Sequence, residues 1–387
     1  MIRRTSFLLF FGSIALPYVW RKRRRRKAIT LAHAHGSSER ILSSSKICDE
    51  IATYCDNYYL SLLDPSGLIH SVWYVITRKM RFRKMLEYSR ELLTLEDGGT
   101  VALDWRKENA DASSPVVVIH HGLCGHSQSS YIRSIVVELE SQGFHCVVFV
   151  ARGCGKNSLT TPETFTASRT SDFKFVIQHV CSKCTGRDVH AVGFSLGAGL
   201  LLKYLGETGD SSPLSSAVAI SPSFDFHVKT SLFPYFSSLA VNGLKKYIKQ
   251  NREFLKGHPS SMLDWEGMMN AKNIYEFDLA AIVGKYRNDN SGRFLHHNSV
   301  EEYYTVSSCI HTVNLIEIPT LVLCSADDPV CSIDGVPTSH NQIGRGLAVV
   351  TVQHGGHVGF GDSPFAPTFF CDRIAGLWMN VARSVLN

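Results

Sequence analysis

From Ser89 to the C-terminus, short apolar runs alternate with longer stretches in which apolar residues recur at helical spacing. The predicted strands cover residues 101–105, 116–121, 146–151, 188–194, 215–221, 320–324 and 347–353, and the predicted helices cover 128–142, 168–180, 196–206 and 365–386. Strands that are apolar on both sides are typical of a mostly parallel sheet between two layers of helices. The alternation therefore predicts an α/β fold in which helices cover both faces of a mostly parallel sheet.

Residues 222–319 interrupt this alternation. Nearly a hundred residues separate two successive predicted strands there, whereas such connections usually take about 2 to 6 residues. The interval holds 14 aromatic residues, among them Phe224, Phe226, Phe233 and Trp265. We predict an inserted helical cap, whose aromatic side chains either meet an apolar substrate or form the core of the cap itself.

The N-terminus carries an apolar segment between two groups of cations. The segment comprises residues 5–20, preceded by Arg3 and Arg4 and followed by seven consecutive cations at residues 21–27. Sixteen residues fall just short of the about 17 to 25 that a membrane-spanning helix needs, although interfacial side chains can close the gap. Cations beside an anchor favour the cytoplasmic side. We therefore expect residues 1–27 to form a single N-terminal membrane anchor with the catalytic body in the cytosol, and the endoplasmic reticulum is a candidate membrane.

Two alternatives remain for this segment. It could lie in the membrane interface without crossing it. The cations could also form a nuclear-localisation tract beside a buried apolar helix.

Residues 28–88 are expected to form a linker and an amphipathic helical region. Within residues 68–86, apolar side chains recur at helical spacing beside a cluster of Lys and Arg; the apolar residues are Ile69, Val72, Trp73, Ile76 and Met80. Such a helix either lies on an anionic membrane or packs on the main domain.

The charge of the chain argues against a nucleic-acid partner. The net charge of +6 arises at the N-terminus, where residues 1–27 hold nine Lys or Arg and no acid. The rest of the chain carries 31 basic and 34 acidic side chains, so its body is not basic.

The eleven cysteines are odd in number and scattered, which is typical of free thiols in a reducing compartment. Cys181 and Cys184 form a C-x-x-C pair without a second pair or a His at zinc spacing. Core packing is therefore the preferred interpretation of the pair, and no metal or other cofactor is expected.

The chemistry centres on the pentapeptide Gly193-Phe-Ser-Leu-Gly197. It follows a predicted strand and opens a predicted helix, which is the position of a nucleophile elbow. Glycine is needed on both sides because a side chain there would collide with neighbouring backbone. The turn is predicted to expose the hydroxyl of Ser195 at the carboxyl edge of the sheet.

A serine nucleophile needs a base, and the base needs an orienting acid. In a fold with this elbow the chain order is Ser, acid, His. Asp327 and Asp328 follow one predicted strand, and His354 and His357 follow the next. We assign the acid to Asp328, which precedes Pro-Val in the turn, in preference to Asp327. We assign the base to His357, which follows two flexible glycines, in preference to His354.

Two backbone N–H groups are needed to form an oxyanion hole. One is expected from Leu196, directly after the nucleophile, and the other from Leu123 in the loop after the strand at 116–121. His120 and His121 look like a metal pair but have no third ligand in register. The string from His357 to Asp362 has the acyltransferase-like form H-x4-D, which we interpret as incidental because its histidine is already the predicted base.

Six motifs resemble, in their order and spacing, those of the membrane-tethered α/β-hydrolase-domain lipases often called the fourth AB-hydrolase family. They are Leu103-Asp-Trp105, His121-Gly-Leu-Cys-Gly125, Ala151-Arg-Gly-Cys-Gly155, Gly193-Phe-Ser-Leu-Gly197, Ala326-Asp-Asp-Pro329 and His354-Gly-Gly-His-Val-Gly-Phe360. The resemblance covers residues 89–387, with the cap at about 222–319, and implies an α/β-hydrolase fold whose triad is Ser195, Asp328 and His357. It further implies acylglycerol lipase or phospholipase activity as in animals, or ester formation and cleavage as in yeasts, and an N-terminal membrane anchor as in many members.

We therefore expect a serine hydrolase that cleaves carboxylic esters of lipids, either acylglycerols or phospholipids, through an acyl-enzyme. The expected partners are a lipid ester and a membrane. An alcohol O-acyltransferase with the same triad is the alternative enzyme. A binding module on a hydrolase fold is the alternative outside catalysis, although such modules usually lose a member of the triad.

Overall fold

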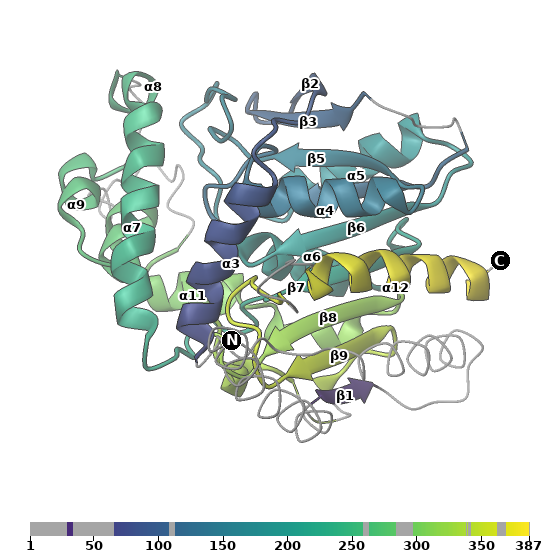
Figure 1. The fold of residues 1–387 in the computed structure, drawn as a ribbon. Helices are drawn as coiled ribbons and strands as arrows, with labels where there is room; N and C mark the ends of the chain where they lie inside the picture. The colour runs from purple at the N-terminus through teal and green to yellow at the C-terminus, as the bar shows by residue number, and fades with distance from the viewer. Residues whose placement is uncertain are drawn as a thin grey trace, which may run out of the picture.

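A computed structural model describes residues 29–33, 66–107, 113–257, 263–283, 297–337, 339, 342–361 and 369–386. The strands of this part form one nine-stranded sheet in the order β1-β9-β8-β7-β6-β4-β5-β3-β2 (Figure 1). The strand bounds are β1 Ile29–His33, β2 Tyr88–Thr94, β3 Thr100–Arg106, β4 Val116–His120, β5 His145–Val150, β6 Val189–Phe194, β7 Ser216–Ile220, β8 Thr320–Ser325 and β9 Leu347–Val352.

The six central strands, from β5 to β9 across the sheet, pair in parallel. Every residue of β4, β6, β7 and β8 is buried, as near-continuous apolar strands require. The antiparallel strands β3 and β2 complete one edge, and β1 pairs antiparallel with β9 at the other. The predicted mostly parallel sheet is confirmed.

The edge strands β1 and β2 were not predicted. The sequence of β2, YSRELLT, contains polar and charged residues, and most of its positions are exposed or half-buried, so no apolar run marks it. The short strand β1 lies in the region expected to be linker and is defined by its pairing with β9. Edge strands of this kind depend on the neighbouring strand for their conformation and not on their own apolar pattern.

Helices cover both faces of the sheet, as predicted. In Figure 1, α4 (Ser130–Ser141) and α12 (Phe370–Leu386) lie in front of the sheet, and α5 (Ser171–Lys183) and α6 (Leu196–Thr208) lie behind it. Most residues of α6 are buried, because this helix packs directly on β6 and β7. The expected α/β fold class is therefore confirmed.

Between β7 and β8 the chain forms helices that stand beyond the carboxyl ends of the parallel strands, at the left of Figure 1. They are α7 (Phe233–Gln250), α8 (Arg252–Gly257), α9 (Trp265–Asn270), α10 (Ile274–Asp278) and α11 (Val300–Ser307). Tyr247, Phe277 and Tyr304 are buried while Tyr235 is exposed, so the aromatic residues of this region are divided between its interior and its surface.

The helix α3 (Gly67–Arg81) packs on the main domain, which was one of the two predicted alternatives. It buries His70, Ser71, Tyr74 and Arg78 against the body of the molecule. The apolar residues that suggested the helix point the other way and are exposed.

The predicted single N-terminal membrane anchor, with its cytosolic catalytic body, is contradicted. Among the described residues no helix is both long enough and apolar enough to cross a membrane. The longest described helix, α7, has 18 residues but carries three lysines, and α12 has 17 residues. Residues 5–20, which suggested the anchor, lie outside the described residues.

Candidate active site

Ser195 lies at the sharp turn between β6 and α6 with a backbone φ of 52° and ψ of −117°. A positive φ is costly for a residue other than glycine and is typical of a strained functional turn. The turn is tight, because a Cβ at Gly193 would lie 2.6 Å from the Gly197 oxygen and one at Gly197 would lie 2.4 Å from the His121 oxygen. The amide of Ser195 donates to the Ile220 oxygen at 2.9 Å, which ties the turn to β7.

A chain of hydrogen bonds joins Ser195, His357 and Asp328. The Ser195 Oγ lies 2.9 Å from His357 Nε2, and His357 Nδ1 lies 2.9 Å from Asp328 Oδ2. Because the ionised carboxylate can only accept, Nδ1 carries the proton and Nε2 is left to accept from the serine hydroxyl. The structure thus brings together the three residues that were predicted to form the triad.

The carboxylate of Asp328 is itself held in place. Its Oδ1 accepts hydrogen bonds from the amides of Val330 and Cys331 at 2.8 and 2.9 Å. Asp328 is buried, whereas His357 is partly exposed. The carboxylate of Asp328 is thus fixed beside the imidazole of His357, and the imidazole stays accessible to the reacting groups.

The other two candidates, Asp327 and His354, form a separate pair beside the first. Asp327 Oδ2 lies 2.9 Å from His354 Nδ1, and Asp327 Oδ1 accepts from the amides of Gly355 and Gly356 at 3.0 Å. Burial opposes ionisation, but the hydrogen bonds from His354, Ser325 and the two glycine amides lower the pKa of Asp327 to about 2. This pair braces the loop before His357.

The loop that carries His357 is also held by residues that the sequence analysis did not single out. The amide of His357 donates to Ser71 Oγ at 2.7 Å, and Arg78 Nη1 donates to the Val358 oxygen at 2.5 Å. The amide of Val358 donates to Ser221 Oγ at 3.1 Å. Ser71 and Arg78 belong to α3, nearly 300 residues away along the chain, so no local motif could have marked them.

Leu123 and Leu196, the predicted oxyanion donors, line the same cavity as Ser195. Among the described residues their backbone N–H groups have no hydrogen-bond partner, so both remain available to a ligand. The loop of Leu123 is fixed by its neighbour Gly122, whose amide donates to Tyr131 Oη at 2.9 Å.

His120 and His121 are buried side chains that support this loop. His121 Nε2 accepts from the Ala151 amide at 3.2 Å, so its Nδ1 donates to the Gly122 oxygen at 2.7 Å. Burial lowers the pKa of His120 to about 3 and that of His121 to about 4, so both are neutral. In the described part of the chain they belong to no cluster of three potential metal ligands.

A cavity of about 150 Å³ opens above Ser195. Most of its lining is apolar or aromatic and comes from the oxyanion loop, the loop after β5 and the helices between β7 and β8. These residues include Leu123, Phe165, Ala167, Phe226, Phe233, Leu244, Ile248, Leu263, Ile274, Phe277, Ile282 and Tyr303. Such a lining suits a hydrocarbon chain.

One acidic side chain, Asp278, lines this mostly apolar cavity, and Lys229 lines it as well. Tyr304 Oη donates to Asp278 Oδ2 at 3.1 Å. Burial raises the pKa of Asp278 to about 7, against the opposing effects of the Tyr304 hydrogen bond and of Lys229. The cavity therefore contains a carboxyl group that changes its charge near neutral pH.

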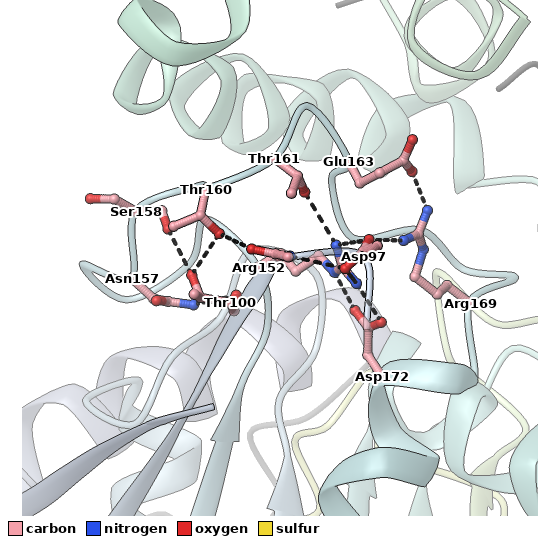
Figure 2. Close-up of polar contacts among 12 residues, drawn as sticks. Asp97, Thr100, Arg152, Asn157, Ser158, Thr160, Thr161, Glu163, Arg169 and Asp172 are labelled. Carbon is pink, nitrogen blue, oxygen red and sulfur yellow. Dashed lines mark hydrogen bonds and ion pairs between the residues drawn. The ribbon is translucent and has the colours of Figure 1, made fainter. Parts of the chain in front are cut away.

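The wall of the cavity beside Phe165 is anchored by an ion-pair network centred on Arg152 (Figure 2). Arg152 is buried and pairs with Asp172 at 2.6 and 2.9 Å and with Asp97 at 2.6 and 3.0 Å. Arg169 joins the network through Asp97 and through Glu163. The network connects the loop of residues 151–170 to the turn after β2 and to α5.

This connection matters because residues 164–167 of that loop line the cavity. The loop is held further by Thr160, whose hydroxyl donates to the Gly98 oxygen at 2.8 Å, and by Asn157, which donates to the Thr100 oxygen at 2.9 Å (Figure 2). The position of one cavity wall thus depends on charged residues that do not touch the cavity themselves.

Comparisons with known proteins identify the fold family of the chain. Residues 115–364 match a family model described as the alpha/beta hydrolase fold. The embryogenesis-associated protein EMB8 of Picea glauca is 30% identical over 302 residues, which are 73% of this chain and 64% of that protein. Phospholipase ABHD3 of Mus musculus is 32% identical over 292 residues, 71% of this chain and 67% of that one. A monoacylglycerol lipase of Saccharomyces cerevisiae is 30% identical over 261 residues, 66% of this chain and 56% of that one. The matched region therefore spans about two thirds or less of the length of these relatives.

Proposed function

The chain belongs to the alpha/beta hydrolase fold family, and we propose that it is a carboxylic ester hydrolase that cleaves lipid esters with Ser195 as nucleophile. The hydrogen-bond chain from Asp328 through His357 to Ser195 is the observation that carries this proposal. This series of hydrogen bonds leads to Ser195 at the apolar cavity, where an ester carbonyl would be placed.

In the first half-reaction Ser195 Oγ attacks the acyl carbonyl while His357 Nε2 takes the hydroxyl proton. Asp328 holds the imidazole by its Nδ1–H and stabilises the positive charge that forms. The amides of Leu123 and Leu196 receive the oxyanion, and each such donor is commonly worth about 3 to 4 kcal/mol of transition-state stabilisation. The alcohol then leaves with the proton from His357, and Ser195 remains acylated.

In the second half-reaction His357 removes a proton from water, which attacks the acyl-enzyme. The fatty acid leaves, and the proton returns to Ser195 Oγ. The same two amides stabilise the second oxyanion, so the chemistry needs only groups that the chain provides.

The apolar lining of the cavity is the argument for a long acyl chain as the part of the substrate that the protein recognises. Its apolar lining can remove methylene groups from water, each worth about 0.8 kcal/mol. The names of two relatives, a phospholipase and a monoacylglycerol lipase, support glycerol-based lipids as the substrate class. A membrane is the natural source of such substrates, and we include it among the proposed partners.

The proposal is tested by labelling with a fluorophosphonate, followed by a panel of acylglycerols and phospholipids. Ser195→Ala is expected to abolish labelling and to lower ester cleavage on every lipid by at least about 10³-fold, because the triad acts as a unit. Ser171→Ala, at an exposed serine that begins α5, is the matched control and should label like the wild type. Undiminished labelling of Ser195→Ala would refute the nucleophile assignment.

Acyl transfer to an alcohol is the alternative use of the same acyl-enzyme. The string that suggested it runs from His357 to Asp362, and Asp362 lies outside the described residues. Supplying an alcohol during the reaction and measuring new ester against free fatty acid separates the two activities. If new ester is the main product, acyl transfer and not hydrolysis becomes the proposed reaction.

A further inference from the structure

The helix α3 has two chemically different faces, and the usual arrangement of these faces is reversed. A helix that packs on a globular domain normally buries its apolar stripe. In α3 the buried side chains are His70, Ser71, Tyr74 and Arg78. Most of the other apolar side chains lie on the opposite side of the helix and are exposed. Among them, Ile69, Val72, Trp73, Ile76 and Met80 are between 40% and 58% exposed. We call these five residues the outer face of α3.

The inner face carries three polar side chains, His70, Ser71 and Arg78, beside the buried ring of Tyr74, because these polar groups make specific contacts with the body. His70 Nε2 accepts from the Gly361 amide at 3.2 Å, and Ser71 Oγ accepts from the His357 amide at 2.7 Å. The charge of Arg78 is compensated by buried Asp372 at 3.3 Å. The reversed orientation of α3 is therefore held by these contacts and leaves the apolar stripe to another partner.

The charge around the outer face identifies the kind of partner. Exposed Lys79, Arg81, Arg83 and Lys84 lie in and directly after the last turn of α3. No acidic residue occurs between Ser66 and Leu86. An apolar helix face that includes a Trp and adjoins a purely basic cluster fits the interface of an anionic bilayer, where the apolar side chains enter between the lipids and the cations meet the headgroups.

We propose that the outer face of α3, with Lys79, Arg81, Arg83 and Lys84, is a docking surface for an anionic lipid bilayer. The inner face of the same helix binds the loop of His357, so the bilayer would lie one helix away from the catalytic histidine. The proposal concerns binding and stands whether or not the chain turns over a lipid. It is therefore tested in the full chain that carries Ser195→Ala, which separates docking from catalysis.

Contact at α3 is measured by fluorescence quenching of Trp73 with vesicles of phosphatidylserine and brominated phosphatidylcholine. The chain has five tryptophans, so the contribution of Trp73 is obtained by comparison with Trp73→Phe, which keeps an aromatic side chain. The quenched component is expected to disappear in Trp73→Phe and to persist in the control Trp105→Phe, whose tryptophan lies in β3. Equal quenching in the Trp73→Phe and parent proteins would overturn the proposal, even where another part of the chain binds the vesicles.

The strength of docking is measured by co-sedimentation with vesicles of phosphatidylcholine, with and without phosphatidylserine. Ile76→Ser with Met80→Ser should weaken binding to the anionic vesicles by at least about tenfold. Lys79→Gln should weaken it about fivefold and reduce its salt dependence. The matched controls are Leu92→Ser on β2 and Lys174→Gln on α5, both exposed and away from α3, and these should bind like the parent.

Unchanged melting temperatures show that a loss of binding is not a loss of fold. Equal binding to neutral and anionic vesicles would exclude the proposed role of the cations. A concentration-dependent dimer that Ile76→Ser abolishes in the absence of lipid would assign the outer face to a second copy of the chain, and would also refute the proposal.

Discussion

Five residues at the candidate active site have backbone conformations that ordinary residues rarely adopt. Cys124, Ser195, Ser221, Val358 and Phe360 have φ values between 44° and 58°. Each such conformation costs about 1 to 3 kcal/mol and persists only where the surrounding contacts impose it. The five positions lie in the oxyanion loop, the nucleophile elbow, the end of β7 and the loop of His357. The body of the protein thus stabilises a strained site whose shape is set before any substrate arrives.

Substitutions of Asp327 and Asp328 should have different effects, one on stability and the other on activity. Asp328→Asn removes the acceptor that orients His357, so kcat is expected to fall by roughly 10⁴-fold with little change in the melting temperature. Asp327→Asn removes a brace of the loop and is expected to lower the free energy of unfolding by about 1 to 3 kcal/mol. Steady-state kinetics and urea unfolding of both variants provide the measurement.

The pH dependence of stability gives a second check on Asp327. Its folded pKa of about 2 lies below the value of about 3.9 for the unfolded chain. The ionised group therefore stabilises the fold above about pH 4, and this contribution fades as the pH falls towards 2.

In the kinetic comparison, a larger loss of activity in Asp327→Asn than in Asp328→Asn would show that Asp327, and not Asp328, is the acid of the triad.

Asp278 should make substrate binding sensitive to pH. Its pKa of about 7 means that the carboxyl is neutral below neutral pH and charged above it. A charged group in the apolar cavity disfavours the acyl chain, so KM for a long-chain ester should rise between about pH 6 and about pH 8. In Asp278→Asn this rise should be absent, while Asp210→Asn, at an exposed position, should behave like the wild type.

The raised pKa of Asp278 also predicts how the stability of the fold changes with pH. Because the folded pKa of Asp278 is above the unfolded value of about 3.9, the native state retains a proton that the unfolded chain has lost. The wild type should therefore lose stability relative to Asp278→Asn as the pH rises from about 4 to about 7. A difference between the two proteins that does not change with pH would show that Asp278 does not titrate in this range.

At the scale of elements, the loop of residues 151–170 depends on the buried charge of Arg152. Arg152→Met would leave Asp172 without its counter-ion and Asp97 with Arg169 alone, and removal of one partner from a buried pair costs about 3 to 5 kcal/mol. Arg383→Met is the matched control, because the pair of Arg383 with Asp188 is about one-third exposed on both sides and should cost less than about 1 kcal/mol. Urea unfolding compares the two variants.

The milder variant Asp97→Asn keeps this test interpretable where Arg152→Met does not fold. Asp97 is more exposed than Asp172, so the protein should remain folded while the loop loosens. KM for a long-chain ester should then rise more than kcat falls, because residues 164–167 form a wall of the cavity and do not take part in the chemistry. A fall in kcat at constant KM would show that the network acts on the triad.

The elements that could be predicted are those whose own sequence determines their conformation. The strands β4 to β9 and the helices α4, α5, α6 and α12 were predicted to within a few residues, because burial on both faces leaves a continuous apolar pattern. The strands β1 and β2 lack that pattern and exist through pairing. For α3 the helical period was correct, but its apolar stripe does not mark the buried face, since polar contacts with distant loops decide the orientation of the helix.

For the whole molecule, the candidate site could be predicted as far as chain order and tight turns determine it. Ser195, Asp328 and His357 follow the ends of parallel strands, and the sheet brings those ends to one edge. The residues that hold them were not predictable in this way. Ser71 and Arg78 reach the loop of His357 across the folded structure, and their partners depend on how α3 packs.

The cysteines should not contribute disulfides to stability. Nine cysteines within the described residues are free, and most of them are buried. The melting temperature is therefore expected to be the same with and without dithiothreitol, since no cross-link among the described cysteines restricts the unfolded chain. Differential scanning calorimetry and the mass of the denatured, alkylated protein measure this directly. A lower melting temperature under reducing conditions would reveal a bond that forms in solution.

The contacts of α3 also determine when during synthesis the candidate active site can be assembled. The hydrogen bond from His357 to Ser71 joins residues 286 positions apart, and the pair of Arg78 with Asp372 joins residues 294 positions apart. Residue 357 must therefore have left the ribosome before the first bond can form, and residue 372 before the second. Ser195 leaves the ribosome 162 residues earlier than His357. A nascent chain of intermediate length would thus carry the proposed nucleophile without its proposed base.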